Sequence, residues 1–279
     1  MQDFRIAVGQ WPVDREKSVN WSRAESFLRN ASTAGASLCL LPEMFQTPYE
    51  LLRMRSCAET ADGPTIDRVR SWARELRLHV VAGSICEQHE DRYYNTSFFV
   101  GPDGGILGAH RKVHLFDVSL ETVRVKESAV LSPGEAPLVV ETPFAKVGVC
   151  ICYDTRFPAI FKAFEERGVE VAAIPAAFSR TTGAAHWHLL MRSRAVDHQI
   201  FLAAACPAPD ETSSYVAYGH SIVVDPWGTV LAEAGEGEEC IFANLSAARL
   251  KKIRDELPLL KHRRKDLYSC WGDDPPGHE

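Results

Sequence analysis

Segments of continuous apolar residues alternate along this chain with segments whose apolar positions recur at helical spacing. The continuous runs predict buried strands, at residues 5–10, 36–41, 79–85, 147–151, 169–174, 200–205 and 240–243. The recurring positions predict helices, at residues 14–34, from Pro64 onward, and at 158–167, 184–199 and 247–256. Gly-containing turns predict two hairpins, at residues 93–110 and 221–232. Strands that alternate with helices in this way predict a layered α/β fold.

One of these predicted strands leads directly into a cysteine. The apolar run 147–151 breaks at Cys152 into the polar group 153–156, and Pro158 can open a helix. A thiol between a strand end and a helix start lies near backbone amides that can lower its pKa and make it a nucleophile. A lone cysteine is more often a small buried apolar residue. The residues around Cys152 do not distinguish a nucleophile from a buried packing residue, so the evidence must come from other segments of the chain.

Two charged residues follow predicted strands in the same way as Cys152. Glu43 comes after the apolar residues 38–41, and Lys112 follows the strand predicted at 105–110. Taken singly, each would be interpreted as a solvated surface charge. Ligands of α/β folds bind at the carboxyl ends of the strands. A carboxylate, an ammonium and a thiol brought together there would supply a base, an oxyanion partner and a nucleophile.

These three segments resemble the Glu-Lys-Cys triad of the nitrilase superfamily, the carbon-nitrogen hydrolases. The resemblance rests on the motif of residues 148–158, Gly-Val-Cys-Ile-Cys-Tyr-Asp-Thr-Arg-Phe-Pro, and on its order after Glu43 and Lys112. It extends from about residue 4 to Tyr268 and favours the Nit branch, and within that branch the omega-amidases. The resemblance implies an αββα four-layer sandwich. We expect a single domain over residues 1–260, followed by a tail at 261–279, because no linker-like stretch divides the chain.

The resemblance also implies a reaction, the hydrolysis of an amide through a thioester on Cys152. Glu43 would act as acid and base in turn. Lys112 and the backbone amide of Tyr153 would stabilise the oxyanion. The segment 125–134 matches the part of the family pattern that carries a second carboxylate, and this gives Glu127 the role of positioning Lys112 and the substrate.

Substrate-binding residues follow from the same resemblance. In omega-amidases an arginine four residues past the nucleophile, with an aromatic residue and a threonine on a later loop, faces the carboxylate end of the substrate. These positions correspond to Arg156, Phe178 and Thr182. Arginine suits bidentate carboxylate recognition, although Arg156 could instead pair with Asp154 or another structural carboxylate. The pocket wall would include Tyr49 and Phe116.

Composition and charge narrow the possible partners. The chain has 279 residues, of which 46% are hydrophobic and 24% charged, and its net charge of -6 argues against general nucleic-acid binding. No apolar run is long enough to span a membrane. The N-terminus lacks the features of a signal peptide. We therefore expect a cytoplasmic protein whose eight cysteines are free thiols.

Other kinds of active site find no support in the sequence. His110 and His114 have a spacing that suits a metal ion on a helix, but their segment is predicted as strand and loop, so we expect no metal. No Walker loop, G-x-S-x-G elbow or complete G-x-G-x-x-G motif is present. We therefore expect an enzyme without a cofactor.

The favoured function is that of an omega-amidase, which releases ammonia from 2-oxoglutaramate or 2-oxosuccinamate. Thr155 stands where Met is common in the family, and residues 119–124 replace a Gly-containing loop, so the length of the substrate stays open. The alternatives are a deaminated-glutathione amidase, a carbamoylase or a nitrilase, a non-catalytic scaffold, and a redox sensor built on Cys150 and Cys152. The family forms dimers through a helical face, and we therefore expect a homodimer.

Overall fold

Two β-sheets face each other at the centre of the protein. The computed structural model describes residues 1–121 and 124–264. One sheet contains, in order, β15 (Glu239–Leu245), β1 (Phe4–Gln10), β2 (Leu38–Leu40), β3 (His79–Val81), β5 (Arg92–Val100) and β4 (Ile85–His89), with β6 (Ile106–Arg111) also paired to β5. The other contains β14 (Val230–Glu233), β13 (Ile222–Val224), β12 (Phe201–Ala205), β11 (Val171–Pro175), β10 (Lys146–Val149) and β9 (Leu138–Glu141). Strands β1, β2 and β3 are parallel, as are β10, β11 and β12, and the other pairs are antiparallel.

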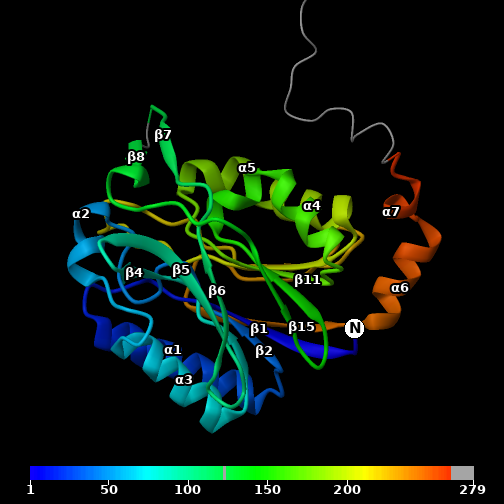
Figure 1. Ribbon diagram of the computed structural model, residues 1–279, viewed down its shortest axis with the longest axis horizontal. Helices are drawn as coiled ribbons and strands as arrows, with labels where there is room; N and C mark the ends of the chain where they lie inside the picture. Colours follow the sequence, from blue (N-terminus) through cyan, green and yellow to red (C-terminus); the bar gives the residue numbers. More distant parts are fainter. Residues whose placement is uncertain (122–123, 265–279) are drawn as a thin grey trace, which may run out of the picture.

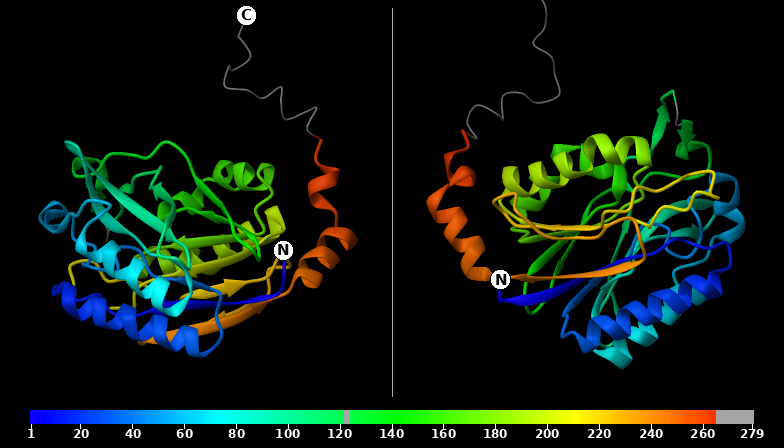
Figure 2. Two further views of the ribbon diagram at one scale, coloured as in Figure 1. Left: turned by 60° about the horizontal axis from the view of Figure 1, so that its bottom comes forward. Right: turned by 180° about the vertical axis from the view of Figure 1, so that it is seen from behind.

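Helices cover the outer face of each sheet, as Figures 1 and 2 show. The first sheet carries α1 (Lys17–Thr33) and α3 (Pro64–Leu76), and the second carries α4 (Pro158–Glu166) and α5 (Arg180–His198). The layers therefore run helix, sheet, sheet, helix, and the predicted αββα sandwich is confirmed. After β15 the chain continues through α6 (Ala247–Glu256) and α7 (Leu259–His262), which lie at one end of the sandwich (Figure 2).

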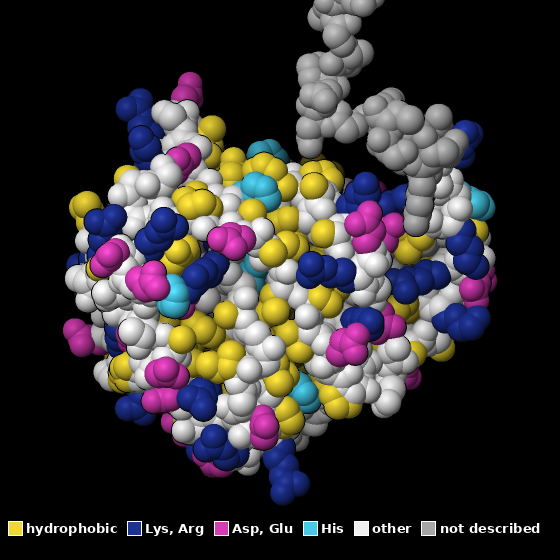
Figure 3. Space-filling view, in the orientation of Figure 1, with side chains coloured by type: hydrophobic (Ala, Val, Ile, Leu, Met, Phe, Trp, Pro, Cys, Tyr) yellow, Lys and Arg dark blue, Asp and Glu magenta, His cyan; other side chains and the backbone are white. Residues whose placement is uncertain are grey.

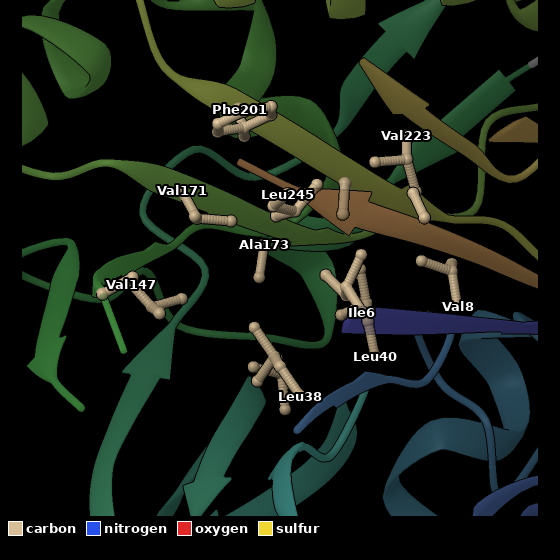
Figure 4. Packing of buried hydrophobic residues seen from close by; sticks show 14 of the residues in the cluster. Ile6, Val8, Leu38, Leu40, Val147, Val171, Ala173, Phe201, Val223 and Leu245 are labelled. Carbon is tan, nitrogen blue, oxygen red and sulfur yellow. The ribbon is translucent and has the colours of Figure 1, made fainter. Parts of the chain in front are cut away.

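The main hydrophobic core lies between the two sheets (Figure 4). Side chains alternate along a strand, so Ile6 and Val8 of β1 point into this core while Ala7 packs under the helices of the first sheet. The same alternation places Val147 and Val149 of β10 between the sheets. Because both faces of these strands are buried, their sequences are continuously apolar, and this is why they were predicted correctly.

Helix α5 begins earlier than the sequence predicted. We expected a loop over residues 178–183 and a helix from residue 184, but the helix begins at Arg180. The hydroxyl of Ser179 accepts a hydrogen bond from the backbone amide of Thr182 at 3.3 Å and so caps the first turn. The expected loop was wrong because Gly183 lies inside the helix, where the ring of Tyr218 leaves no room for a side chain.

Three further segments differ from expectation. The strand expected at 79–85 is two strands, β3 and β4, because the chain turns at Gly83 with φ +51° and packs against the carbonyl oxygen of Pro42. The stretch 112–134, where we predicted no helix or strand, contains a short hairpin of β7 (Asp117–Ser119) and β8 (Arg124–Lys126). The first helix begins at Lys17, because the Asp14 carboxylate accepts a hydrogen bond from the Glu16 amide instead of capping the helix.

The remaining expectations concern the surface charge, membrane-spanning segments and the C-terminal tail. On the face drawn in Figure 3, Lys and Arg side chains are interspersed with Asp and Glu. Among the described residues, no helix is long and apolar enough to cross a membrane. Most of the tail predicted at 261–279, including Tyr268 at the end of the family resemblance, lies outside the described residues.

Candidate active site

The backbone at Cys152 is strained, and the side chain is buried. Cys152 opens a 3₁₀ turn, Cys152–Arg156, just after β10, and has φ 47°. A positive φ in a residue other than glycine is uncommon and costs free energy. Hydrogen bonds hold this conformation, because the Thr155 hydroxyl donates to the Cys152 carbonyl oxygen at 2.7 Å and the Ile151 amide donates to Asp154 Oδ2 at 3.0 Å.

Lys112 lies between two carboxylates. Its Nζ is 3.1 Å from Glu43 Oε1 and 3.0 Å from Glu127 Oε1, and all three side chains are fully buried. Burial alone would lower the pKa of Lys112, but the charges of Glu127 and Glu43 outweigh burial and raise it. Lys112 is therefore a permanently charged ammonium, able to stabilise an anion that forms beside it.

The Glu127 carboxylate is held from both sides. The Tyr49 hydroxyl donates to its Oε1 at 2.5 Å, and the Phe116 amide donates to its Oε2 at 2.5 Å. With Lys112, this makes three donors to one carboxyl group, which together fix its orientation. Tyr49 and Phe116, predicted as pocket wall, thus also orient Glu127, and the Phe116 ring packs edge-on against Tyr153.

Glu43 has one oxygen that is occupied and one that is available. Its Oε1 accepts hydrogen bonds from Asn95 Nδ2 at 2.7 Å and from Lys112, whereas Oε2 has no hydrogen-bond partner among the described residues. Burial raises the pKa of Glu43, and the charge of Lys112 opposes that rise. Burial and the neighbouring Glu43 charge raise the pKa of Cys152 well above its usual value. The resting nucleophile is therefore a neutral thiol next to a carboxylate, and its proton must move as it attacks.

An unexpected network joins the Lys112 segment to the nucleophile turn. Asp154 is fully buried and accepts hydrogen bonds from His110 Nε2, His114 Nδ1 and the His114 amide, each at 2.9 Å. Burial alone would raise the pKa of Asp154, but the bonds from both histidines lower it. His110 and His114 flank Lys112, so Asp154 fixes that segment against the turn that begins at Cys152. The spacing of His110 and His114 therefore reflects their shared hydrogen bonds to Asp154.

Arg156 does not pair with Asp154. Its Nη1 lies 3.2 Å from His186 Nδ1, and its guanidinium lies over the Phe178 ring at 5.0 Å. Among the described residues, no carboxylate lies within 4.0 Å of Arg156, which is half-buried. The alternative in which Arg156 pairs with Asp154 is therefore wrong. The guanidinium remains available to an anion from outside the chain.

The remaining predicted contact, Thr182, lies in the first turn of α5. Its hydroxyl is 3.0 Å from that of Ser179, and the side chain is buried. A cavity of about 30 Å³ borders Glu43, Tyr49 and Tyr215, room for roughly one or two water molecules. Tyr215 was not predicted from the sequence, and its ring packs against Tyr49 at 4.7 Å while its hydroxyl donates to the Ala177 carbonyl oxygen.

The other cysteines do not add chemistry to this site. Cys150 is fully buried and packs in the core under α4 and α5, and burial raises its pKa. Cys39, Cys86 and Cys206 are also buried. Within residues 1–121 and 124–264, no cluster of three His, Cys, Asp or Glu side chains could hold a metal ion.

Comparison with known proteins agrees with this geometry. The family described as "Carbon-nitrogen hydrolase" matches residues 5–255, which is most of the chain. The protein belongs to the carbon-nitrogen hydrolase family. Omega-amidase NIT2 of Danio rerio is 43% identical over 270 residues, covering 96% of this chain and 98% of the relative. The human omega-amidase NIT2 is 42% identical over the same share of both chains.

Solved structures of carbon-nitrogen hydrolases share the fold and illustrate its chemistry. Nit3 of Saccharomyces cerevisiae superposes with a TM-score of 0.86 at 38% identity, covering 94% of this chain and 97% of Nit3. An amidase from Nesterenkonia superposes with a TM-score of 0.80 at 26% identity, covering 96% of this chain and 97% of that one. One of its structures shows the acetamide moiety of fluoroacetamide added covalently at the active-site cysteine. The present chain is thus an amidase of the nitrilase superfamily with an active-site cysteine.

The structure brings together the residues that the sequence nominated. Glu43, Lys112 and Glu127 are in direct contact, and Cys152 is close enough to Glu43 for each to shift the pKa of the other. Their individual catalytic roles stay predictions. Sequence reasoning missed Asn95, which lies in the middle of strand β5 and is buried against Glu43.

Proposed function

We propose that this protein hydrolyses a small carboxylate-bearing amide to an acid and ammonia, as an omega-amidase does. The proposed substrates are 2-oxoglutaramate and 2-oxosuccinamate. The proposal is supported by the similarity to omega-amidases NIT2 and by one feature of the site, the half-buried guanidinium of Arg156 that lacks a carboxylate partner among the described residues. A half-buried cation loses part of its hydration, and without a counter-ion nothing offsets that loss. A substrate carboxylate would relieve that cost when it binds.

The first half of the proposed reaction forms a thioester. Glu43 Oε2 takes the proton from the Cys152 thiol as the sulfur adds to the amide carbonyl carbon. The carbonyl oxygen becomes an oxyanion, which Lys112 Nζ and the backbone amide of Tyr153 stabilise. Glu43 then gives its proton to the amide nitrogen, the C–N bond breaks, and ammonia leaves.

The second half regenerates the enzyme. Glu43, now a carboxylate again, takes a proton from a water molecule whose oxygen adds to the thioester carbon. The new oxyanion meets the same two donors. When it collapses, the C–S bond breaks, the acid leaves, and Glu43 returns the proton to the Cys152 sulfur. One carboxylate can act in both halves because each begins with proton removal and ends with proton return.

Lys112 is suited to oxyanion stabilisation because Glu43 and Glu127 already hold it. Their carboxylates keep the ammonium charged and in one place. A preorganised charge costs little reorganisation when the oxyanion forms. Lys112 is already paired with both carboxylates, so an anionic substrate needs a second cation. The proposed cation for the substrate carboxylate is Arg156, whose guanidinium lies over the Phe178 ring, and Thr182 is the further proposed contact.

The deciding experiment measures ammonia release from 2-oxoglutaramate, with Cys152→Ala as the control. We expect turnover by the wild type and none by the variant, because no other side chain can form the thioester. Circular dichroism and thermal unfolding establish that the variant is folded. Intact-protein mass after substrate addition should show an acyl adduct on the wild type alone.

The other outcomes separate the alternatives. Turnover of deaminated glutathione but not of 2-oxoglutaramate would favour that amidase, and the absence of any adduct with a panel of amides would favour a scaffold. The homodimer and the cytoplasmic location also remain proposals. Sedimentation equilibrium tests the first, and fractionation of the source cells tests the second.

A further inference from the structure

The side chain of Arg156 is held by a neutral partner from another element. Its Nη1 lies 3.2 Å from Nδ1 of His186, which belongs to α5. We infer that His186 is a positioning residue that aims Arg156 at the substrate carboxylate and so sets the preference for anionic over neutral amides. This inference rests on the proposed function, and it names the group that makes Arg156 selective.

The contact determines the proton arrangement on His186. A guanidinium can only donate hydrogen bonds, so Nδ1 must be the acceptor and the ring proton must lie on Nε2. The imidazole in this contact is therefore uncharged. A carboxylate in the same place would orient Arg156 equally well but would cancel its charge. A neutral acceptor orients the guanidinium and leaves the full positive charge for a ligand.

Helix α5 also holds the backbone at Arg156. Arg194, two helical turns beyond His186, is buried and donates from Nε to the Thr155 carbonyl oxygen at 2.9 Å and from Nη2 to the Arg156 carbonyl oxygen at 3.3 Å. Residues four apart lie on one helix face, so Thr182 and His186 share a face. That face meets the nucleophile turn, and Arg156 is fixed at both its main chain and its side chain.

Two aromatic rings also contact the guanidinium of Arg156. Phe178 lies 5.0 Å from the guanidinium carbon of Arg156 and Tyr153 lies 5.8 Å from it, distances at which a cation is attracted to a ring. A free arginine loses considerable rotamer freedom when it binds a ligand, and an arginine that is already ordered loses less. Removing His186 should therefore weaken the binding of an anionic substrate, because part of the binding free energy is then lost in ordering the Arg156 side chain.

The test compares two amides of equal chain length. Glutaramate carries a carboxylate at the end opposite the amide, and pentanamide does not. His186→Leu removes the acceptor, and His186→Asn keeps an acceptor near the Nδ1 position. His186→Asp keeps an acceptor but neutralises Arg156. His188→Leu is the matched control, since His188 lies on the same helix but is paired with Glu233 at 2.7 Å on the outer surface.

For His186→Leu and His186→Asp we expect KM for glutaramate to rise about tenfold, which corresponds to about one hydrogen bond, with a much smaller change in kcat. The ratio of kcat/KM for glutaramate to that for pentanamide should fall by a similar factor. His186→Asn should restore most of the preference, and His188→Leu should leave the ratio as in the wild type. Pentanamide serves as the internal check that each variant is folded.

Equal losses on both amides would show that His186 is merely structural, and an unchanged ratio in both His186→Leu and His186→Asp would show that it does not position Arg156. Either result overturns the inference while the proposed function stands. A wild type that hydrolyses pentanamide but not glutaramate would overturn both.

Discussion

Lys112 Nζ lies 3.1 Å from Oε1 of Glu43, and both side chains are fully buried. Lys112 follows β6 and Glu43 follows β2, two strands that are not neighbours in the sheet. This ion pair therefore ties separate parts of the sheet together at the point where Cys152 enters from the second sheet. The same contact leaves the other oxygen of Glu43 available for proton transfer.

Glu43→Gln should lower kcat by at least ~10²-fold, as expected for the loss of a general acid–base group. Glutamine has nearly the same shape and can still accept the hydrogen bond from Asn95. Steady-state ammonia release measures the loss, and thermal unfolding verifies the fold. Near-normal kcat in this variant would remove Glu43 from the proposed mechanism.

Lys112→Met should lower activity by at least ~10²-fold and destabilise the fold at pH 7 by about 3–5 kcal/mol. The variant leaves Glu43 and Glu127 buried without a counter-ion. Because the pKa of Glu43 is raised even in the wild type, protonation should relieve the strain, so urea unfolding should show a smaller deficit at pH 5 than at pH 7. The control is Lys146→Met, which removes an exposed pair with Glu141 and should leave the stability nearly unchanged.

The Cys152 thiol should stay protonated up to pH 9. Burial and the Glu43 charge raise its pKa well above the ordinary value of 9.0. The ultraviolet absorbance difference between wild type and Cys152→Ala reports the thiolate directly. Glu43→Gln removes the negative charge and should shift the transition to lower pH. A thiolate signal in the wild type at pH 7 would contradict proton transfer during attack.

Tyr49→Phe should destabilise the protein by about 2 kcal/mol, since it removes a buried hydrogen bond to the charged Glu127. We expect kcat to fall as well, because Glu127 helps to hold Lys112. Tyr215→Phe is the matched control, in which the lost bond is to the neutral Ala177 carbonyl oxygen, and it should cost about 1 kcal/mol. Urea unfolding of both variants makes the comparison, and equal costs would mean that the charge on Glu127 contributes nothing.

Asp154→Asn should show a stability deficit that depends on pH. Hydrogen bonds from His110 and His114 outweigh burial and lower the pKa of Asp154 below its usual 3.8. A lowered folded-state pKa adds stability above the unfolded-state pKa, and this stability is lost as the pH falls below about 3.8. The gap between wild type and variant in urea unfolding should therefore be full at pH 7 and narrower at pH 3. A gap that does not change with pH would mean that the variant fails for another reason.

The sequence predicted many of the strands and two of the three central residues for a shared physical reason. A strand that is buried on both faces has a continuous apolar sequence, and a charged or reactive residue just after it marks the sheet edge. Glu43 and Cys152 follow this pattern, whereas Lys112 follows β6, a strand that is largely exposed. The start of α5 was missed because the Ser179 cap was interpreted as part of a loop, and the hairpin at 117–126 was missed because its strands are short and partly exposed.

The amino-acid pattern alone determined the layered α/β fold and the placement of a carboxylate, an ammonium and a thiol at strand ends, because burial of apolar strands is a local property of the sequence. Only the tertiary structure decided which partners each group has. Asn95 reaches Glu43 across 52 positions of the chain, and His186 reaches Arg156 across 30. Such contacts depend on how sheets and helices pack, and no local pattern encodes them. The packing of sheets and helices therefore leaves Glu43 Oε2 without a hydrogen bond and places the neutral His186 beside Arg156.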